Sequence, residues 1–290
     1  MLAYLKLLRP RQMTKNVFCF AGLIFSGRFL EPGAIPHACL AFAAFCLISS
    51  AVYILNDCID RERDRVHVRK RHRPIASGAV SLPAAVCLAL LLTALAVWLA
   101  LAASVGTLVC LLLYMLNNLA YSIVLKHKAL VDVISIAIGF VLRLLAGVYA
   151  VDDLPTSWIT LCTFFLAVFL GFCKRRAELG GIVPESENEQ RPVLSQYTLQ
   201  FLDYLVNSSA VMTVMCYALF TTTGNKDPSL VVTVPVVFFA VLHYKRIVML
   251  LHDGEEPEKL VLRDGRLQIS IALWFALYLA IALGNWHLFR

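Results

Sequence analysis

Long runs of apolar residues, separated by short polar segments, make up most of the chain. A helix needs about 20 such residues to cross the hydrocarbon core of a bilayer. The runs are continuous, whereas the strands of a membrane β-barrel alternate apolar and polar positions. The pattern predicts nine transmembrane helices, over residues 14–30, 35–56, 84–103, 106–125, 129–151, 155–174, 199–222, 229–250 and 268–288.

The first predicted span has a short apolar run, Val17–Phe29, which ends at Arg28 and Phe29. Basic residues precede it, so it also has the pattern of a signal peptide. The residues that follow, Leu30-Glu31-Pro32, lack the small side chains of a cleavage site. We therefore expect an uncleaved span.

Composition supports a membrane protein. Of the 290 residues, 60% are hydrophobic and 16% are charged, against roughly 25% charged in an ordinary soluble domain. These values exclude a disordered, collagen-like or soluble multidomain chain. The nine cysteines show no CxxC spacing, which predicts packing residues and not disulfides or a metal cage. We expect an all-α polytopic fold that forms one transmembrane domain over residues 1–290.

The net charge of +7 comes from 26 Lys and Arg against 19 Asp and Glu. With nine spans, only Arg28, Lys226 and Arg290 fall on one side, and Arg143 lies inside a span. By the positive-inside rule, the amino terminus and the loops that carry the other basic residues are cytoplasmic. A cation within a span faces a partner or a cavity. We expect a structural partner for Arg143, with substrate contact as the alternative.

Carboxylates are concentrated where the second span ends. If the helix continues, Asp57, Asp60 and Asp64 lie at i, i+3 and i+7 on one face, beside Asn56. Oxygen ligands of this kind suit Mg²⁺, which is held by one or two carboxylates together with substrate phosphates. The alternative is a solvated helix end whose acids pair with the neighbouring arginines, which are Arg61, Arg63 and Arg65.

A basic segment follows the acids and contains Lys70, Arg71 and Arg73. Arginine and lysine beside a metal-binding acidic patch are the expected partners of a polyphosphate, because guanidinium groups bind phosphate oxygens in pairs.

The run Asn56-Asp57-x-x-Asp60-x-x-x-Asp64, with Arg73-Pro74 and Ser77-Gly78 after it, resembles the first aspartate-rich motif of the UbiA superfamily of intramembrane prenyltransferases. The resemblance covers nearly the whole chain. It implies a UbiA-like helical bundle with cytoplasmic motif loops, in a bacterial cytoplasmic (inner) membrane, and Mg²⁺ as cofactor.

The second aspartate motif of that superfamily follows the sixth span, where this chain has Lys174-Arg175-Arg176-Ala177-Glu178. Cations replace acids, so the chain departs from the aromatic prenyltransferases in the sign of this charge. The run is similar to the branch of decaprenyl-phosphate phosphoribosyltransferases. Further segments with the same similarity are residues 8–16, 121–128, 140–147, 194–198, 255–258 and 262–264.

This resemblance implies transfer of 5-phosphoribose from phosphoribosyl diphosphate to a polyprenyl (decaprenyl) phosphate, with release of diphosphate, for cell-wall arabinan precursors. The expected partners are these two substrates and membrane lipid, without nucleic acid, and a homo-oligomer is left open. One alternative is a prenyltransferase that moves an isoprenoid from its diphosphate to an aromatic acceptor. Another is a transporter, which the absence of a clear internal repeat in the sequence disfavours.

The predicted catalytic and metal-binding residues are Asp57, Asp60 and Asp64, with Asn56 as a further metal ligand. The predicted substrate-binding residues are Lys15, Asn16, Lys70, Arg71, Arg73, Tyr121, Lys126, Lys174, Arg175, Glu178, Tyr197, Arg263 and Asp264. Within that set, Lys15, Tyr121 and Lys126 are expected to meet the lipid phosphate, and Glu178 and Asp264 to orient cations or bind ribose hydroxyls. An acidic loop is expected to be solvated and without a catalytic role, and contains Glu185, Glu187 and Glu189.

Overall fold

The computed structural model describes residues 2–67, 70–181, 192–223, 227–250, 254 and 256–284. All secondary structure in these residues is helical. The chain divides into two compact units, each described by itself below. The first unit comprises Met1–Leu125 and Ile138–Pro155, and the second comprises Lys126–Ala137 and Thr156–Arg290.

Eight helical segments in the described residues are long and apolar enough to cross a membrane, and they correspond to eight of the nine predicted spans. They are α3 (Ala34–Ile59), α5 (Leu82–Ala103), α6 (Val105–Ile123), α7 (Val131–Ala150), α8 (Ser157–Gly180), α9 (Leu199–Thr223), η7 (Pro228–Thr233) with α10 (Val234–Leu250), and α12 (Gly265–Gly284). Shorter helices connect or precede them, namely α1 (Leu2–Leu7), η2 (Arg28–Leu30), α4 (Arg61–Val66), η3 (Lys70–His72), η4 (Leu125–His127), η6 (Pro192–Gln196) and α11 (Pro257–Arg263).

The first predicted span differs from the expectation. Its residues form a 3-10 helix, η1 (Pro10–Val17), and then a nine-residue α-helix, α2 (Phe18–Ser26). Gly27 ends α2 in the left-handed conformation, with φ of 77°, which glycine adopts without steric cost. Nine residues rise about 14 Å at 1.5 Å each, so α2 alone is too short to span, and the count of nine is not confirmed.

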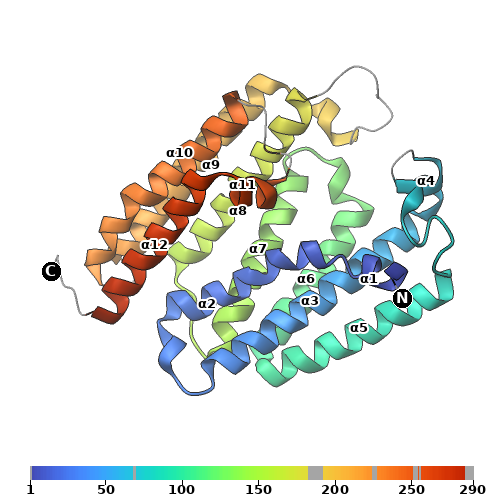
Figure 1. The fold of residues 1–290 in the computed structure, drawn as a ribbon, viewed down its shortest axis with the longest axis horizontal. Coiled ribbons are helices and arrows are strands. Elements are labelled where there is room, and N and C mark those ends of the chain that lie inside the picture. The colour runs from blue at the N-terminus through green and yellow to red at the C-terminus, as the bar shows by residue number, and fades with distance from the viewer. Residues whose placement is uncertain are drawn as a thin grey trace. The chain divides into compact units, whose positions relative to one another are not determined.

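Small residues allow α3 and α5 to pack closely in the first unit (Figure 1). Ala85, Ala89, Ala96 and Ala100 recur at helical spacing on α5 and are each at most 1% exposed. Four alanines on α3 are equally buried, namely Ala38, Ala41, Ala44 and Ala51. Helices that cannot rely on the hydrophobic effect against lipid associate through such small side chains, because their backbones approach closely.

Two glycines allow α2 and α7 to touch backbone to backbone. A Cβ atom added to Gly147 would collide with the carbonyl of Cys19, and one added to Gly22 would collide with the backbone of Gly147 and Val148. The second half of α7 is thereby held against the amino-terminal segment of the first unit.

Arg143 has the structural partners that the sequence led us to expect. It is 5% exposed, and its guanidinium donates to the Asn16 side-chain oxygen at 2.7 Å, the Tyr114 hydroxyl at 2.7 Å and the Gly139 carbonyl at 2.9 Å. The guanidinium also lies 4.5 Å from the centroid of the Tyr114 ring. These contacts join η1, α6 and α7.

In the second unit, α8 packs along α9, and α10 packs against α9 and α12 (Figure 1). Phe169, Phe220, Leu202 and Val248 are at most 1% exposed and belong to its core. All nine cysteines of the chain, each within the described residues, are free thiols, and most of them are buried. The prediction that they are packing residues is confirmed for the six buried cysteines but not for Cys39 and Cys87, which are exposed.

Candidate active site

The predicted acidic motif lies where α3 passes into α4. Asp60 interrupts the helix for one residue, yet hydrogen bonds continue through it, from the Asp60 N–H to the Asn56 carbonyl and from the Asp64 N–H to the Asp60 carbonyl, both at 2.9 Å. Asp57 and Asp64 therefore stay on one face, as the spacing predicts, and each is 4% exposed. We call Asn56, Asp57, Asp60 and Asp64 the acidic cluster.

Two arginines neutralise this cluster. One Arg73 nitrogen donates to both Asp57, at 3.0 Å, and Asp64, at 2.7 Å. Arg9 donates to the same Asp57 oxygen at 2.5 Å, and its guanidinium lies 4.9 Å from the centroid of the Tyr53 ring. Arg9 has a left-handed backbone, with φ of 48°, which turns the chain between α1 and η1.

Two of the three arginines expected by the alternative interpretation, Arg61 and Arg65, pair with Glu62. Arg65 donates to both Glu62 oxygens at 3.2 Å, and Arg61 lies 3.9 Å from Glu62. The buried acids Asp57 and Asp64 are therefore paired with Arg9 and Arg73, and not with Arg61 or Arg65.

The residues of the acidic cluster fit a hard divalent cation. Within the described chain, no three His, Cys, Asp or Glu side chains are close enough to form a metal site by themselves. The donor set is nevertheless of the type that Mg²⁺ prefers, since it consists of carboxylate and amide oxygens. Asn56 adds an observation, because its side-chain oxygen is buried without a hydrogen-bond partner among the described residues. An orphaned buried acceptor costs free energy, and a cation held beside Asp57 would satisfy it.

A second charged cluster surrounds Arg175 in the second unit. Arg175 is 2% exposed, and it donates to Asp132 at 2.8 Å and to Glu178 at 2.7 Å. Asp132 is completely buried and also accepts from the Tyr197 hydroxyl at 3.1 Å. We call Asp132, Arg175, Glu178 and Tyr197 the Arg175 cluster.

The Arg175 cluster fixes the segment before α7. Leu130 has a left-handed backbone, with φ of 67°, which a branched side chain adopts only at a cost. Its N–H donates to the Tyr197 hydroxyl at 2.6 Å. The side chain of Gln196 accepts from the Ala129 N–H at 3.1 Å. Burial raises the pKa of Tyr197 to about 12, against the opposing effect of the Leu130 N–H, so the hydroxyl keeps its proton.

Of the three cations in the predicted phosphate-binding run, the structure buries two in ion pairs. Arg176 donates to Asp203 at 3.1 Å and to the Val248 carbonyl at 3.2 Å, and Arg175 is paired as above. The Lys174 side chain is 33% exposed and lies 4.0 Å from Glu178. Lys174 is therefore the most accessible cation of the run.

The other predicted substrate-binding residues occupy different environments. Asn16 is completely buried, and its amide donates to Ser49 at 3.1 Å and to Cys46 at 3.3 Å. The remaining residues are at least partly exposed, namely Lys15, Lys70, Arg71, Tyr121, Lys126, Arg263 and Asp264. The acidic loop residues Glu185, Glu187 and Glu189 lie outside the described residues, as do Lys226 and Arg290.

Asp264 begins α12. Its carboxylate accepts from the Leu267 N–H at 2.9 Å and lies 3.1 Å from the His243 imidazole. The Leu267 N–H, with His243, holds the pKa of Asp264 below its usual value of 3.8. The carboxylate is therefore charged at neutral pH and stabilises the helix start.

Sequence reasoning missed the partners of the predicted cations, which are Arg9, Asp132 and Asp203. Asp132 and Asp203 could have been found by the criterion that singled out Arg143, because each is a charged residue inside a predicted span. Arg9 carried no comparable signal, since it is one basic residue among several before the first span.

Comparison with known proteins bears on both units. The model of the UbiA prenyltransferase family matches residues 16–263. The decaprenyl-phosphate phosphoribosyltransferase of Mycolicibacterium smegmatis is 32% identical over 93% of this chain and 89% of its own. The decaprenyl-phosphate phosphoribosyltransferase of Corynebacterium glutamicum is 31% identical over 96% of this chain and 86% of its own.

Among solved structures, a UbiA homolog from Archaeoglobus fulgidus bound to GPP and Mg²⁺ has a TM-score of 0.72 at 22% identity. The match covers 97% of this chain and 99% of that one, so the fold is shared along the whole length. The eight apolar helices, the acidic helix end and these matches agree, and the chain is an integral membrane protein that belongs to the UbiA prenyltransferase family.

Proposed function

We propose that this protein transfers 5-phosphoribose from phosphoribosyl diphosphate to a polyprenyl phosphate and releases diphosphate. The observation that carries the proposal is the acidic cluster, where Asp57 and Asp64 are held on one face beside an orphaned Asn56 oxygen. Similarity to two decaprenyl-phosphate phosphoribosyltransferases over more than nine-tenths of the chain supports phosphoribose as the transferred group.

Asp57, Asp60 and Asp64, with Asn56, would hold Mg²⁺ at the end of α3. Bound there, the ion supplies a template for the donor diphosphate and a Lewis acid that stabilises its charge. The rigid end of a long helix fixes the carboxylates in advance, so little reorganisation is needed on binding.

Basic residues of the same unit bind the donor phosphates. Lys70 and Arg71 are exposed on η3, which contacts α4, and Arg73 already lies within hydrogen-bond distance of Asp57 and Asp64. Their charge stabilises the diphosphate as the bond from ribose C1 to its oxygen breaks. The new bond forms between C1 and an oxygen of the lipid phosphate, which is already anionic and needs no strong general base.

Lys174 and a member of the Arg175 cluster, Glu178, have separate proposed roles. Lys174 binds phosphate, because it is the accessible cation of its run. Glu178 binds ribose hydroxyls, and Arg175 positions it through their 2.7 Å contact. We therefore assign Arg175 a positioning role, because its buried guanidinium is held by the carboxylates of Asp132 and Glu178.

The acceptor phosphate is bound by Lys15, Tyr121 and Lys126, each partly exposed at or near a helix end. We further propose that residues 1–290 act as one domain, since the family match crosses both units. The loops that carry these residues face the cytoplasm of a bacterial inner membrane, in keeping with the distribution of basic residues.

The test is transfer by the purified protein in lipid vesicles with Mg²⁺, phosphoribosyl diphosphate labelled in the ribose, and decaprenyl phosphate. Sugar-labelled lipid is expected, and chelation of the metal should abolish it. A parallel reaction with labelled geranyl diphosphate and an aromatic acceptor tests prenyl transfer. Prenylated product without sugar-labelled lipid would overturn the proposal.

Asp60 provides a sharper variant, because the Arg73 bridge joins Asp57 and Asp64 and remains in place when Asp60 is changed. Asp60→Asn should abolish transfer while the thermal stability of the protein stays near that of the wild type. Glu62→Gln is the matched control, since Glu62 is exposed and pairs only with Arg61 and Arg65 among the described residues. Full activity of Asp60→Asn would remove the metal role assigned to the acidic cluster.

A further inference from the structure

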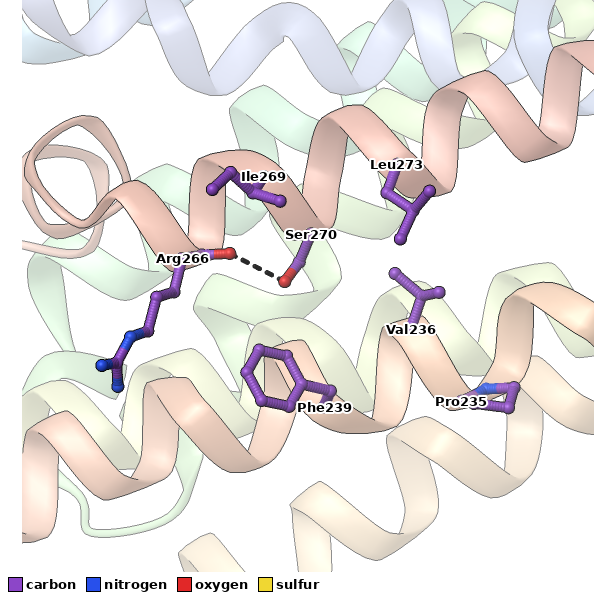
Figure 2. A pocket seen from close by; sticks show the side chains of 7 residues that line it. All are labelled: Pro235, Val236, Phe239, Arg266, Ile269, Ser270 and Leu273. Atoms are coloured by element: carbon purple, nitrogen blue, oxygen red, sulfur yellow. Dashed lines mark hydrogen bonds between the residues drawn. The ribbon is translucent and has the colours of Figure 1, made fainter.

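A groove of about 510 Å³ lies between α10 and α12 in the second unit (Figure 2). Its walls are apolar, with Val236 and Phe239 from α10 and Ile269 and Leu273 from α12. Phe239 is 51% exposed and Ile269 is 68% exposed, so protein side chains in the described chain leave this surface uncovered. Both helices are apolar and long enough to lie in a bilayer.

One end of the groove carries a cation. Arg266 is the single charged residue among those that line it, and its side chain lies at the opposite end from Pro235 (Figure 2). Across the described residues, the Arg266 guanidinium makes no hydrogen bond or ion pair. The nearby Ser270 hydroxyl donates to the Arg266 backbone carbonyl at 2.8 Å, so its proton is already used.

The position of this cation is unfavourable without an anion. Arg266 lies in the first turn of α12, where the helix dipole disfavours positive charge. The nearby Asp264 carboxylate is directed to the Leu267 N–H and His243 and forms no ion pair with Arg266 among the described residues. An anion beside Arg266 would gain from both the guanidinium and the helix start.

The charge and shape together define the ligand. The distance along α12 from Arg266 to Leu273 is about 10 Å at 1.5 Å per residue, enough for part of a hydrocarbon chain. One guanidinium binds the two oxygens of a phosphodiester as a pair and balances the single net charge of an anionic phospholipid, whereas in phosphatidylcholine the choline cation already balances that charge. A phosphate monoester has a second pKa near 6 and carries close to two charges at pH 7, which one guanidinium does not balance.

We propose that this groove binds a bilayer phospholipid with an anionic headgroup, whose phosphodiester contacts Arg266 and whose hydrocarbon chain lies against Phe239, Ile269 and Leu273. The residues that line the groove are not among the proposed substrate-binding residues, and the proposal does not depend on the proposed function. Its occupant bridges α10 and α12 beside Asp264, at the start of the last span.

The experiment uses the full-length protein in detergent and native mass spectrometry, with phosphatidylglycerol and phosphatidylcholine of equal chain length as probes. The wild type should bind at least one phosphatidylglycerol in preference to phosphatidylcholine. Arg266→Gln should weaken phosphatidylglycerol binding about tenfold or more, the loss expected for a charge-assisted hydrogen-bond pair. Arg266→Lys should lose less, because it keeps the charge.

Two further variants separate the groove from general surface charge. Ile269→Trp places a larger side chain in the groove and leaves Arg266 unchanged, so it should displace the lipid. Arg246→Gln removes an exposed cation from α10 that does not line the groove, and should leave the preference unchanged. Equal binding by Arg266→Gln and the wild type, or the same loss in Arg246→Gln, would overturn the proposal. So would stronger competition by decaprenyl phosphate, which would make the groove an acceptor site.

Discussion

Asp132 provides a direct test of the buried ion pairs in the second unit. Asp132→Asn is nearly isosteric and keeps an acceptor for the Tyr197 hydroxyl, but it removes the charge that faces Arg175 at 2.8 Å. Arg175 is 2% exposed and Asp132 is fully buried, so the guanidinium cannot recover water. We therefore expect a large loss of stability.

The magnitude follows from two opposing considerations. Removing one partner of a buried ion pair costs about 3 to 5 kcal/mol. Arg175 keeps Glu178 as a partner, and polar contacts between membrane helices are worth less because the unfolded segment also finds partners. We expect a loss of about 2 to 3 kcal/mol, which lowers the melting temperature by roughly 5 °C.

Lys174→Gln is the matched control, because Lys174 belongs to the same helix and lies 4.0 Å from Glu178 with its side chain 33% exposed. Such a pair contributes at most about 1 kcal/mol. The assay is thermal unfolding of the purified variants in detergent, followed by the loss of the monodisperse peak. Lys174→Gln should keep its stability and lose transfer. Equal stability of Asp132→Asn and the wild type would refute the reasoning.

A double variant checks the mechanism of that loss. Asp132→Leu alone leaves the Arg175 charge buried with one carboxylate, whereas Asp132→Leu with Arg175→Met removes both charges. The double variant should be more stable than Asp132→Leu alone, since a well-packed apolar pair replaces an ion pair with little cost. Additive losses would show that packing, and not charge, explains the single variants.

Three further predictions concern other features. Gly147→Ala should destabilise the protein by about 1 to 3 kcal/mol or more, because the new Cβ meets the Cys19 carbonyl. Gly265→Ala is the control: its Cβ would point into open space, so its stability in the same thermal assay should be close to that of the wild type. Asp264 has a pKa below its usual 3.8 in the folded state. Its contribution to stability is therefore complete above pH 3.8 and is lost as the pH falls through the lower folded-state pKa. Acid unfolding of Asp264→Asn should lack this pH-dependent loss of stability. Removal of divalent cations by chelation should abolish transfer and leave the helical circular dichroism unchanged, and addition of Mg²⁺ should restore transfer. Full activity in the presence of chelator would contradict the metal role.

Helix positions were predictable because they depend on local apolar runs. The run over residues 199–222 corresponds to α9 at Leu199–Thr223, and that over 35–56 corresponds to α3. The first span was the exception, where Gly27 in a left-handed conformation ends α2 after nine residues. The hydropathy pattern shows that this segment is apolar, but it does not indicate the short 3-10 helix that precedes α2.

The acidic cluster was also predictable, since its three carboxylates lie within eight residues of one helix end. Their partners were not, because contact between Arg9 and Asp57 joins residues 48 positions apart, and contact between Arg175 and Asp132 joins residues 43 positions apart. Sequence reasoning singled out these cations and assigned several of them to phosphates. Their burial in ion pairs depends on tertiary packing, which no local pattern encodes.

Arg9 and Arg73 are counterions that the chain supplies to its own carboxylates. A divalent cation that takes the oxygens of Asp57 and Asp64 competes with these two guanidiniums. Each guanidinium that it displaces becomes an anion-binding group held at the same helix end. Uptake of cation and polyanion is therefore thermodynamically linked, and each must raise the affinity for the other by the same factor. The metal alone is expected to bind weakly, and the donor should tighten it.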